Sequence, residues 1–538
     1  MPEAVIGPEA GPGPPIACRG APGPERPVAR STALAYDAGN DPRPSPANPA
    51  LPQHEVDNPM AAASSPDFDL IVLGAGTGGY TAAFRAAQLG MRVALVDQGK
   101  IGGTCLHLGC IPTKALLVSA EFYARLKKAK DFGIVLEGAA GFDYEAIAKR
   151  RDAVVKRMWT GLKSLVDKNK VTWIGGRARF DGPTTIRIAL NGEDGAPGAG
   201  GERTVTAKDV IIATGSRVKS LPGLVPDGRR IITSDDVTTK GDRPKSIAIV
   251  GAGAVGSEFA SLFHDLGVAV TLLEYLPAIV PLEDKDASQA LERSFGRRGI
   301  KVMTKARFEI SSVKVTDDGV TLTVGPEGGA AEELKVEQLL VATGRAPNTE
   351  NIGLETTKVE LDRGFIKVDG WMRTAQEHVY AIGDVIGGLM LAHVAAHEGI
   401  VAVHEIAGEG PEPIDYDHQP RATYTHPQVA SIGLTEQQCA ERGIAIKKGV
   451  FNFAADAKAV IVCETEGFAK VIADADTDEV LGVHLVGPNV TDLIAEAALG
   501  MTLEATAWEI GAATHPHPTL AEVLGEAAMA VAGRQINA

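Results

Sequence analysis

Two stretches of the sequence share one pattern, in which an apolar run is followed by closely spaced glycines, a helical segment and a second apolar run that ends in an acid. The first copy spans residues 68–97, and the second spans residues 245–274. Each copy predicts a strand, a helix and a parallel strand, which together form the βαβ unit that binds dinucleotides. We therefore predict an α/β protein with two Rossmann-like domains.

The first copy reads FDLIVLGAGTGGYTAAFRAAQLGMRVALVD. Its glycines stand in the GxGxxG spacing, which lets the backbone approach a pyrophosphate at a helix N-terminus, and the terminal acid accepts hydrogen bonds from ribose hydroxyls. A lone GxGxxG is weak evidence, but here the strand, the helix and the acid stand in register. The predicted cofactor-binding residues of this copy are Gly74, Gly76, Gly79 and Asp97.

The second copy, KSIAIVGAGAVGSEFASLFHDLGVAVTLLE, implies a second dinucleotide. Its predicted binding residues are Gly251, Gly253, Gly256 and Glu274. The carboxylate of Glu274 would accept a hydrogen bond from a 2′-hydroxyl and repel a 2′-phosphate. The residues that follow it, YLPAIVP, contain no arginine to hold a phosphate. We therefore predict NAD rather than NADP as the second ligand.

The net charge of -15 and the absence of a long apolar run exclude several classes of function. An acidic surface repels nucleic acids and acidic membrane faces. No apolar stretch approaches the roughly 20 residues that cross a bilayer, and the N-terminus lacks a basic segment followed by an apolar one. We predict a cytoplasmic protein that binds neither nucleic acid nor membrane.

The first 66 residues differ in composition from the rest of the chain. Residues 1–66 are dense in Pro, Gly and Ala and show almost no periodic apolar pattern. Such a segment buries too little surface to offset the entropy lost on ordering, so we predict a disordered leader. A short polar lead separates Met60 from the first predicted strand, and initiation of translation at Met60 is a hypothesis.

Two of the five cysteines, Cys105 and Cys110, lie in GGTCLHLGCIPT, directly after a glycine pair. A regular helix would separate them by about 7.5 Å along its axis, which is too far for a disulfide bond. The glycines and Pro112 permit an irregular turn that could bring the sulfurs together. A helix is expected from about Thr113, and a helix N-terminus favours a reactive thiolate.

Three other interpretations of the cysteine pair are buried structural thiols, a zinc site and a static bridge. Zinc takes four ligands, and only His107 stands near the two sulfurs in the sequence, so we predict no metal site. A static bridge across so short a loop would add little stability. Because the pair follows the first fingerprint directly, a redox-active disulfide beside that dinucleotide is the simplest interpretation.

A candidate base for thiol chemistry lies more than 400 residues further on, in ATHPHPTLAEVLGE. His515 and His517 alternate with prolines there, and Glu522 follows on an incipient helix. A carboxylate on the far nitrogen of a histidine fixes its tautomer and raises its basicity. Only folding or a second subunit could bring this histidine to the cysteines.

Three further apolar strands end in glycine turns or an acid. Two of them, DVIIATGS at residues 209–216 and QLLVATGRAPN at residues 338–348, are interpreted as crossover points between domains. The third, YAIGDV, places Asp384 where a carboxylate could accept from polyol hydroxyls. In isolation, a turn-forming aspartate is an equally good interpretation of Asp384.

Taken together, the motifs from Asp67 to the C-terminus resemble the pyridine nucleotide–disulfide oxidoreductases, and most closely the branch that oxidises dihydrolipoyl groups. In family order they read GAGTGGY, GGTCLHLGCIPTKAL, IIATGS, GAGAVGSEFA, VATGRAPN, YAIGDV, LAHVAAHEG, YTHPQVASIG and HPHPTLAE. The resemblance implies two Rossmann-like domains that bind FAD and NAD, a central region and an α+β C-terminal dimerisation domain. The implied segments are 67–215 for FAD, 216–344 for NAD, 345–414 for the central domain and 415–538 for the interface.

The resemblance also implies roles for individual residues. Cys105 matches the interchange thiol and Cys110 the thiol that contacts the flavin, while His517 matches the base and Glu522 its orienting carboxylate. The remaining matches are Lys114 beside the flavin, Glu258 as its acidic partner and Asp384 as the flavin-binding aspartate. Further contacts to the two dinucleotides are expected from Gly103, Thr104, Lys114, Thr214, Gly215, Ser216 and Gly344.

The implied reaction oxidises protein-bound dihydrolipoamide to lipoamide and reduces NAD⁺ through the disulfide and FAD. The implied assembly is a homodimer that serves a lipoyl-bearing acyltransferase of a 2-oxoacid dehydrogenase complex or a glycine-cleavage lipoyl protein. A related disulfide reductase with another substrate and a non-catalytic flavoprotein scaffold are the alternatives. The chain departs from the family at His107, which stands between the cysteines and is either a pKa modulator or a solvent-facing turn residue.

Overall fold

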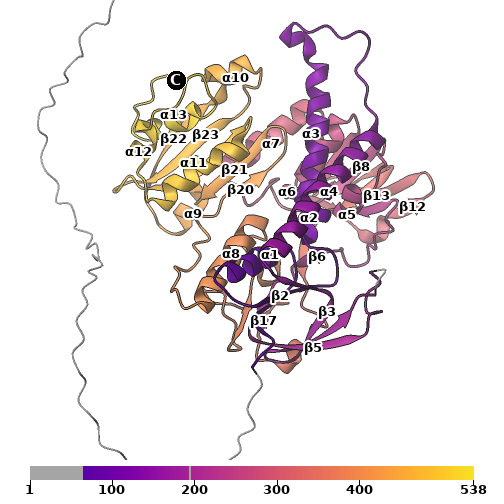
Figure 1. The fold of residues 1–538 in the computed structure, drawn as a ribbon. Helices are drawn as coiled ribbons and strands as arrows, with labels where there is room; N and C mark the ends of the chain where they lie inside the picture. The colour runs from indigo at the N-terminus through magenta and orange to yellow at the C-terminus, as the bar shows by residue number, and fades with distance from the viewer. Residues whose placement is uncertain (1–64, 193–194, 538) are drawn as a thin grey trace, which may run out of the picture. The chain divides into compact units, whose positions relative to one another are not determined.

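The computed structural model describes residues 65–192 and 195–537. Residues 1–64 lie outside the described residues. Both the predicted disorder of residues 1–66 and the hypothesis about Met60 concern this segment. Within the described part of the chain, no helix is both long enough and apolar enough to cross a lipid bilayer. Figure 1 shows the succession of strands and helices along the chain.

The first sheet is built around the first fingerprint. Its strands run in the order β1-β2-β3-β4-β5-β19, and β1 also pairs with β5. The bounds are β1 (Phe68–Leu73), β2 (Val93–Asp97), β3 (Thr172–Gly182), β4 (Thr185–Leu190), β5 (Glu202–Ile212) and β19 (Val379–Ala381). Strand β1 is almost wholly buried and pairs in parallel with β2 and β5, as its continuous apolar run predicts. Helix α1 (Thr77–Gln88) buries a face of small residues that includes Ala82, Ala83 and Ala86.

A second parallel sheet holds the second fingerprint, in the order β10-β9-β8-β15-β7. Its strands are β7 (Ile231–Thr233), β8 (Ser246–Val250), β9 (Ala269–Leu273), β10 (Lys301–Met303) and β15 (Gln338–Val341). Helices α5 (Ser234–Thr239), α6 (Ala254–Asp265) and α7 (Lys285–Arg298) accompany it. A small antiparallel sheet comprises β11 (Ala306–Phe308), β12 (Lys314–Thr316), β13 (Gly319–Pro326) and β14 (Glu332–Val336).

The chain leaves the first sheet for the second and later returns to it. Strand β19, which follows the whole second sheet in sequence, pairs in parallel with β5 of the first. At the two crossings, β6 (Ser216–Val218) and β16 (Arg345–Pro347) pair with each other in antiparallel fashion. The two glycine turns that the sequence interprets as crossover points therefore lie side by side.

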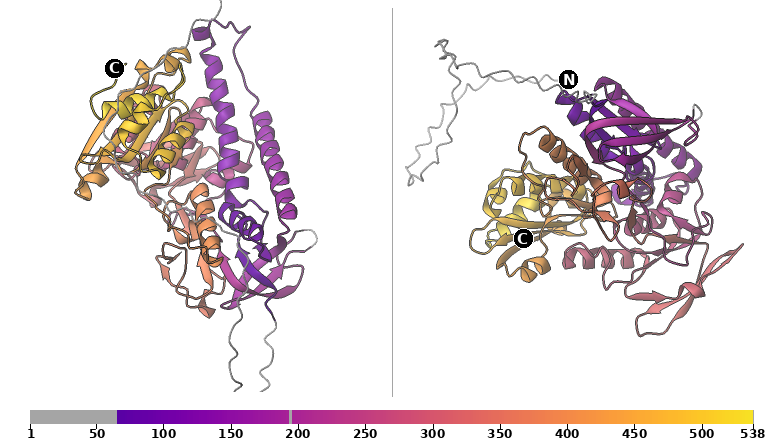
Figure 2. Two further views of the ribbon diagram at one scale, coloured as in Figure 1. Left: turned by 60° about the vertical axis from the view of Figure 1, so that its left-hand side comes forward. Right: turned by 90° about the horizontal axis from the view of Figure 1, so that it is seen from below.

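Two long helices follow the first βαβ unit. They are α3 (Cys110–Lys127) and α4 (Tyr144–Lys168), and they run beside each other (Figure 2). Helix α3 begins at Cys110, a few residues earlier than the sequence predicts, and a short helix, α2 (Gly103–His107), precedes it. Helix α8 (Ala392–Ile406) packs against α1.

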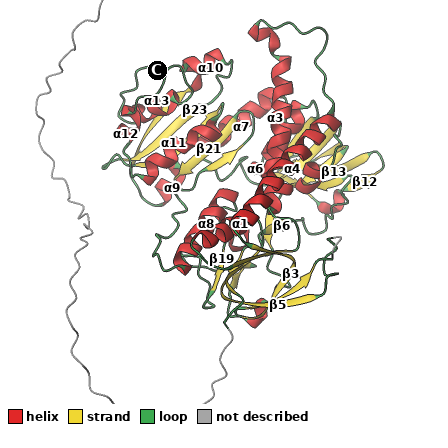
Figure 3. Cartoon of the chain, in the orientation of Figure 1, coloured by secondary structure: helices red, strands yellow, loops and turns green. Residues whose placement is uncertain are grey.

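The C-terminal part is an antiparallel sheet covered by helices (Figure 3). Its order is β20-β21-β24-β23-β22. The strands are β20 (Arg421–Thr423), β21 (Gln428–Gly433), β22 (Ile446–Asn452), β23 (Phe468–Asp474) and β24 (Val480–Gly487). Helices α11 (Val490–Thr502) and α13 (Glu522–Ala530) pack on the strands, while α9 (Glu436–Glu441), α10 (Ala457–Ile461) and α12 (Ala507–Ala512) are shorter. The α+β character predicted for this part is confirmed.

Candidate active site

The first fingerprint forms a turn that a dinucleotide can approach. A Cβ atom on Gly79 would lie 1.9 Å from the carbonyl oxygen of Gly74, so only glycine lets the helix start this close to the strand. Around Gly76, by contrast, a Cβ would meet nothing within 4 Å. No side chain caps the N-terminus of α1, and its free N–H groups suit a phosphate. The carboxylate of Asp97 accepts hydrogen bonds from Ala75 N and Gly99 N, both at 2.7 Å.

The second fingerprint repeats this geometry. A Cβ atom on Gly256 would lie 1.9 Å from the carbonyl oxygen of Gly251, and the space around Gly253 is open. The buried carboxylate of Glu274 accepts from Ala252 N at 2.7 Å and from Leu276 N at 2.8 Å. In both copies the terminal acid thus braces the glycine turn while standing at the end of the second strand, where a ribose would lie.

The residues that directly follow Glu274 are not its only neighbours. Although YLPAIVP contains no arginine, the fold brings Arg307 of β11 to this place, with its guanidinium 3.6 Å from the ring centroid of Tyr275. Arg307 also donates to the carbonyl oxygen of Tyr275 and to Glu327, both at 2.9 Å. The sequence could not show this contact because Arg307 stands 33 positions after Glu274. The place beside Glu274 therefore holds a guanidinium, which is paired with the carboxylate of Glu327.

The paired crossing strands hold the next group of predicted residues. Thr214 Oγ1 donates to the carbonyl oxygen of Asn348 at 2.8 Å, and Gly215 and Gly344 both take positive φ angles. Ser216 bonds to the carboxylate of Asp384. Arg345 donates to Ser216 Oγ at 2.5 Å and lies 3.5 Å from Asp384. The polar groups of both crossings therefore converge on Asp384.

The cysteine loop is docked on the first fingerprint. Gly102 N donates to the carbonyl oxygen of Ala75 at 2.8 Å, and a Cβ atom on Gly103 would lie only 2.6 Å from the Cα of Gly76. Thr104 accepts from Leu108 N at 2.8 Å and closes the short helix α2. A break at Leu108 and Gly109 separates α2 from α3, which is the irregular turn that the spacing of the cysteines requires.

Cys105 and Cys110 are free, half-buried thiols that interact with each other. Hydrogen bonds from the side chain and the backbone of Cys110, together with one from the Thr77 hydroxyl, outweigh burial and lower the pKa of Cys105 to about 7. The same thiol–thiol bond and burial raise the pKa of Cys110. The pair therefore gives up one proton near neutral pH and keeps the second.

A half-buried cation stands beside this pair. Lys114 Nζ lies 2.8 Å from both carboxylate oxygens of Glu258 and 4.5 Å from the ring centroid of Tyr424. Burial disfavours the charged form of Lys114. The negative charge of Glu258 and its hydrogen bonds outweigh this effect and raise the pKa of Lys114. The ammonium lowers the pKa of both cysteines, so it favours a thiolate.

The C-terminal histidine has the predicted partner. His517 Nδ1 lies 2.9 Å from Glu522 Oε1, and Glu522 Oε2 accepts from Thr519 N at 2.8 Å. The side chain of His517 is 71% exposed. Its Nδ1 is held by a carboxylate, which leaves Nε2 to exchange a proton. Within the described residues, no hydrogen bond or ion pair joins His517 to either cysteine.

Two polar contacts at the site were missed in the sequence. Thr77, inside GAGTGGY, bonds to both the Cys105 thiol and the Tyr80 hydroxyl. His515 forms a second histidine–carboxylate pair, with Nε2 2.7 Å from Glu496 Oε1. The position of a hydroxyl residue within the fingerprint could have indicated the contact of Thr77. No local sequence pattern indicates the contact of His515 with Glu496.

His107 lies between the loop that precedes the cysteines and helix α4. Its Nε2 lies 2.9 Å from the carbonyl oxygen of Ile101, and its ring packs edge-on against Trp159 at 6.5 Å. His107 thus braces the loop before the cysteines against α4. It is half-buried rather than solvent-facing, and it is not among the leading influences on the pKa of either cysteine.

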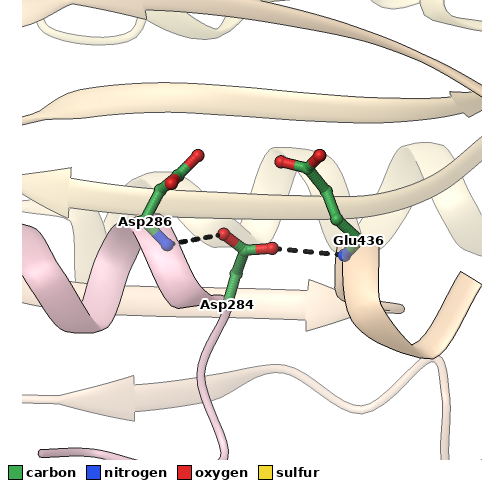
Figure 4. Close-up of side chains that lie close together, drawn as sticks. All are labelled: Asp284, Asp286 and Glu436. Atoms are coloured by element: carbon green, nitrogen blue, oxygen red, sulfur yellow. Dashed lines mark hydrogen bonds between the residues drawn. The ribbon is translucent and has the colours of Figure 1, made fainter. Parts of the chain in front are cut away.

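One cluster of carboxylates in the described residues has the spacing of a metal site. It consists of Asp284, Asp286 and Glu436 (Figure 4). However, the Nζ of the buried Lys470 bonds to all three, at 2.7 Å to Asp284, 2.5 Å to Asp286 and 2.5 Å to Glu436. The ammonium already supplies the positive charge that these oxygens require, so the group is an ion cluster that joins α7 to the C-terminal sheet.

Comparison with known proteins finds matches along nearly all of the described chain. Residues 68–399 match the family described as pyridine nucleotide-disulphide oxidoreductase, and residues 419–528 match the dimerisation domain of that family. The dihydrolipoyl dehydrogenase of Bacillus subtilis is 45% identical over 473 residues, which cover 88% of this chain and 99% of the relative. That of Mycobacterium tuberculosis is 43% identical over 475 residues, covering 87% and 99%.

Comparison with solved structures finds the same fold. The structure of LpdA from Mycobacterium tuberculosis matches with a TM-score of 0.78 at 29% identity, covering 85% of this chain and 98% of that one. The HOCl-induced flavoprotein disulfide reductase RclA from Escherichia coli matches with a TM-score of 0.73 at 25% identity, covering 86% and 99%. The predicted resemblance and the predicted fold class of the described chain are confirmed.

Proposed function

Because the chain belongs to the pyridine nucleotide-disulphide oxidoreductase family, we propose that it oxidises protein-bound dihydrolipoamide to lipoamide and reduces NAD⁺ to NADH. The observation that carries this proposal is the pair Cys105 and Cys110, docked on the first glycine turn beside the ammonium of Lys114. The similarity to dihydrolipoyl dehydrogenases over almost their whole length supports the choice of substrate.

The residues fit the two cofactors of the family. The uncapped start of α1, the open space at Gly76 and the acid Asp97 would hold the pyrophosphate and a ribose of FAD. The equivalent groups around Gly253 and Glu274 would hold NAD⁺. When bound, FAD carries two electrons from the dithiol to the nicotinamide as a hydride.

The base starts the reaction with the substrate dithiol. His517, held by Glu522, takes a proton from one thiol, and the resulting thiolate attacks the sulfur of Cys105 in the oxidised enzyme. The Cys105–Cys110 bond breaks, and Cys110 leaves as a thiolate. In this state Cys105 is part of a disulfide and no longer forms the thiol–thiol bond that raises the pKa of Cys110. Lys114 and the N-terminus of α3 stabilise the negative charge of Cys110.

A second exchange completes the oxidation of the substrate. His517 gives its proton to the sulfur of Cys105 as this sulfur leaves, and it takes up the proton of the other substrate thiol. That thiol sulfur attacks the substrate sulfur of the mixed disulfide, the bond to Cys105 breaks, and lipoamide leaves. The proton that remains on His517 is released to water. Both cysteines are now reduced, and their two electrons pass on to NAD⁺ with restoration of the disulfide. The net reaction consumes one dihydrolipoamide and one NAD⁺ and produces one lipoamide, one NADH and one proton.

The family's dimerisation domain, matched at residues 419–528, supports a homodimer. We place the exposed His517 of one subunit against Cys105 of its partner. This arrangement accounts for a histidine–carboxylate pair that, within the described part of the chain, forms no hydrogen bond or ion pair with Cys105 or Cys110. The partner in the cell would be a lipoyl-bearing acyltransferase of a 2-oxoacid dehydrogenase complex or a glycine-cleavage lipoyl protein.

The predicted division at 67–215, 216–344, 345–414 and 415–538 is kept as part of the proposal. The alternation of sheets along the chain, with β19 returning to the first sheet, supports an inserted NAD domain. The cytoplasmic location remains a prediction.

Substitution of each cysteine by serine tests the chemistry. C105S and C110S are expected to retain FAD and to lose dihydrolipoamide-dependent reduction of NAD⁺, while direct oxidation of NADH by an artificial electron acceptor persists. Retention of dihydrolipoamide turnover by either variant would contradict the proposal. Loss of both activities together with FAD would instead indicate that the loop serves cofactor binding alone.

A further inference from the structure

Glu398 of α8 is a buried carboxylate to which the reaction gives no role. It is 2% exposed, and burial together with the neighbouring charge of Asp384 raises its pKa. Both of its oxygens accept hydrogen bonds: Oε2 from Gly383 N at 2.6 Å and Oε1 from Tyr416 Oη at 2.9 Å. Burial of a carboxyl group costs free energy unless the group is hydrogen-bonded. These two hydrogen bonds therefore explain why the fold tolerates Glu398 in its interior.

One of the two donors belongs to the turn that presents Asp384. Gly383 takes φ +74°, and a Cβ atom there would lie 3.3 Å from the Cβ of Ala395 in α8. The Glu398 carboxylate therefore fixes the backbone immediately before Asp384. Ser216 and Arg345 hold the other side of Asp384 through its carboxylate.

Helix α8 is itself held close to the first fingerprint. A Cβ atom on Gly78 of α1 would lie 2.9 Å from the carbonyl oxygen of Ala395, and one on Gly399 would lie 2.9 Å from the carbonyl oxygen of Gly78. The two helices thus pack backbone to backbone. Glu398 stands beside Gly399 at this crossing, so one rigid contact joins the first glycine turn to the turn of Asp384.

The second donor comes from the segment that leads into the C-terminal sheet. Tyr416 lies five residues before β20. The residue is 38% exposed, while its hydroxyl donates to Glu398. Burial and the carboxylate raise the pKa of Tyr416. The phenol therefore stays a donor at neutral pH and links the start of the C-terminal part to the Asp384 turn.

We propose that Glu398 and Tyr416 are positioning residues for FAD, which hold the Gly383–Asp384 turn in the conformation that binds the ribityl hydroxyls. This inference rests on the proposed function, because it requires that Asp384 contacts FAD. It adds that the acid of α8 acts through the backbone N–H of Gly383 and that the C-terminal part contributes to flavin retention through Tyr416.

Flavin release from the purified holoenzyme tests the proposal. Dissociation of FAD is followed by its fluorescence after dilution, for the wild type, E398A, E398Q, Y416F and the exposed control E412A. Loss of one buried hydrogen-bond partner typically costs enough to speed release about tenfold. E398A should therefore release FAD about tenfold faster, whereas E398Q should remain near the wild type because its amide oxygen still accepts from Gly383. Y416F should lie between them.

The visible flavin spectrum and the unfolding midpoint of each variant separate positioning from general stability. The proposal expects a shifted flavin absorbance in E398A and rescue in E398Q. A variant E398A that unfolds more easily but releases FAD at the wild-type rate would overturn it, as would release from E398Q as fast as from E398A. If the wild type binds no FAD, the proposed function itself is contradicted. If the wild type binds FAD but E398A releases it at the wild-type rate, only the positioning role of Glu398 is contradicted.

Discussion

Lys114 and Glu258 stand 144 residues apart in the chain, yet the Nζ of Lys114 lies 2.8 Å from both oxygens of the Glu258 carboxylate. One residue comes from the cysteine helix α3 and the other from the helix α6 of the second fingerprint. The ion pair therefore couples the two dinucleotide-binding units at the point where the thiols lie.

Removal of the ammonium should weaken the thiolate. Lys114 lowers the pKa of both cysteines, so in K114M the first proton of the dithiol is expected to leave at higher pH. The substitution also leaves the buried carboxylate of Glu258 without its partner, which destabilises the fold. The measurement is a pH titration of thiolate absorbance in the reduced protein, with K127M at an exposed lysine of α3 as the control. An unchanged titration in K114M would show that the ammonium does not act on the thiols.

The hydroxyl of Thr77 should set the acidity of Cys105. T77V removes a donor to the sulfur, so the pKa of Cys105 should rise above about 7. At pH 7 the alkylation of Cys105 in the reduced protein is expected to slow by about threefold, the effect of one net hydrogen bond. T81V, on the same helix, serves as the control. Equal alkylation profiles for T77V and T81V would contradict this role.

The base should act across the subunit interface. H517A is expected to lower turnover by roughly 10²- to 10⁴-fold, and E522Q should lower it less because the imidazole remains. If subunits of H517A and C105S are unfolded and reassembled together, random pairing restores one complete site in half of the dimers. Activity should then recover to about a quarter of the wild-type value. Failure of mixed dimers to recover any activity, despite proven exchange of subunits, would place both groups in one chain.

Nucleotide choice should depend on Glu274 and on the pairing of Arg307. E274Q removes the negative charge that opposes a 2′-phosphate, and E327Q frees the guanidinium of Arg307. We expect kcat/KM for NADP⁺ to rise about tenfold in E274Q, and further in the double variant, through new charge-assisted hydrogen bonds. Steady-state kinetics with both nucleotides measure the effect. A ratio that stays constant in the double variant would exclude both residues as determinants.

The Lys470 cluster should make the fold sensitive to acid. Burial opposes the charges of Asp284 and Glu436. Hydrogen bonds led by that from Lys470 outweigh it at Asp284, and those from Lys448 and Lys470 outweigh it at Glu436, so both pKa values lie below their ordinary values of 3.8 and 4.5. A carboxylate whose pKa is lower in the folded state than in the unfolded state stabilises the fold at pH values above its ordinary pKa. This stability is lost as the pH falls through the folded-state pKa. K470M should lose about 3 kcal/mol at pH 7, and its deficit relative to the wild type should shrink below about pH 4.

Denaturant unfolding between pH 7 and pH 3 measures this deficit, and K447M, at an exposed lysine of β22, is the matched control. A K470M deficit that is the same at every pH would show that packing, rather than charge, holds this contact.

The features that the sequence predicts well are those encoded within short segments. In both fingerprints the glycine spacing and the terminal acid lie within about 25 residues, and each acid accepts a hydrogen bond from the turn of its own unit. The partnership of His517 with Glu522 was likewise predictable because a turn and the start of a helix bring them together.

The features that sequence reasoning missed depend on residues that only tertiary structure brings together. Arg307 reaches Tyr275 from a strand of another sheet, and Lys470 reaches Asp284 across 186 positions. Neither contact follows a helical or strand period, so no local pattern indicates it. Glu398 and Tyr416 are closer in sequence, but Tyr416 lies outside helix α8, so no helical period links the two residues.

The central claim is tested most directly by mixing the purified protein with dihydrolipoamide and NAD⁺ under anaerobic conditions, with NADP⁺ in a parallel reaction. Nicotinamide reduction and flavin absorbance are followed together. We predict rapid formation of NADH, little reaction with NADP⁺, and a long-wavelength band from the contact of a thiolate with the flavin. A flavin that stays oxidised while dihydrolipoamide is present would contradict the account, because electrons would then not pass through Cys105 and Cys110.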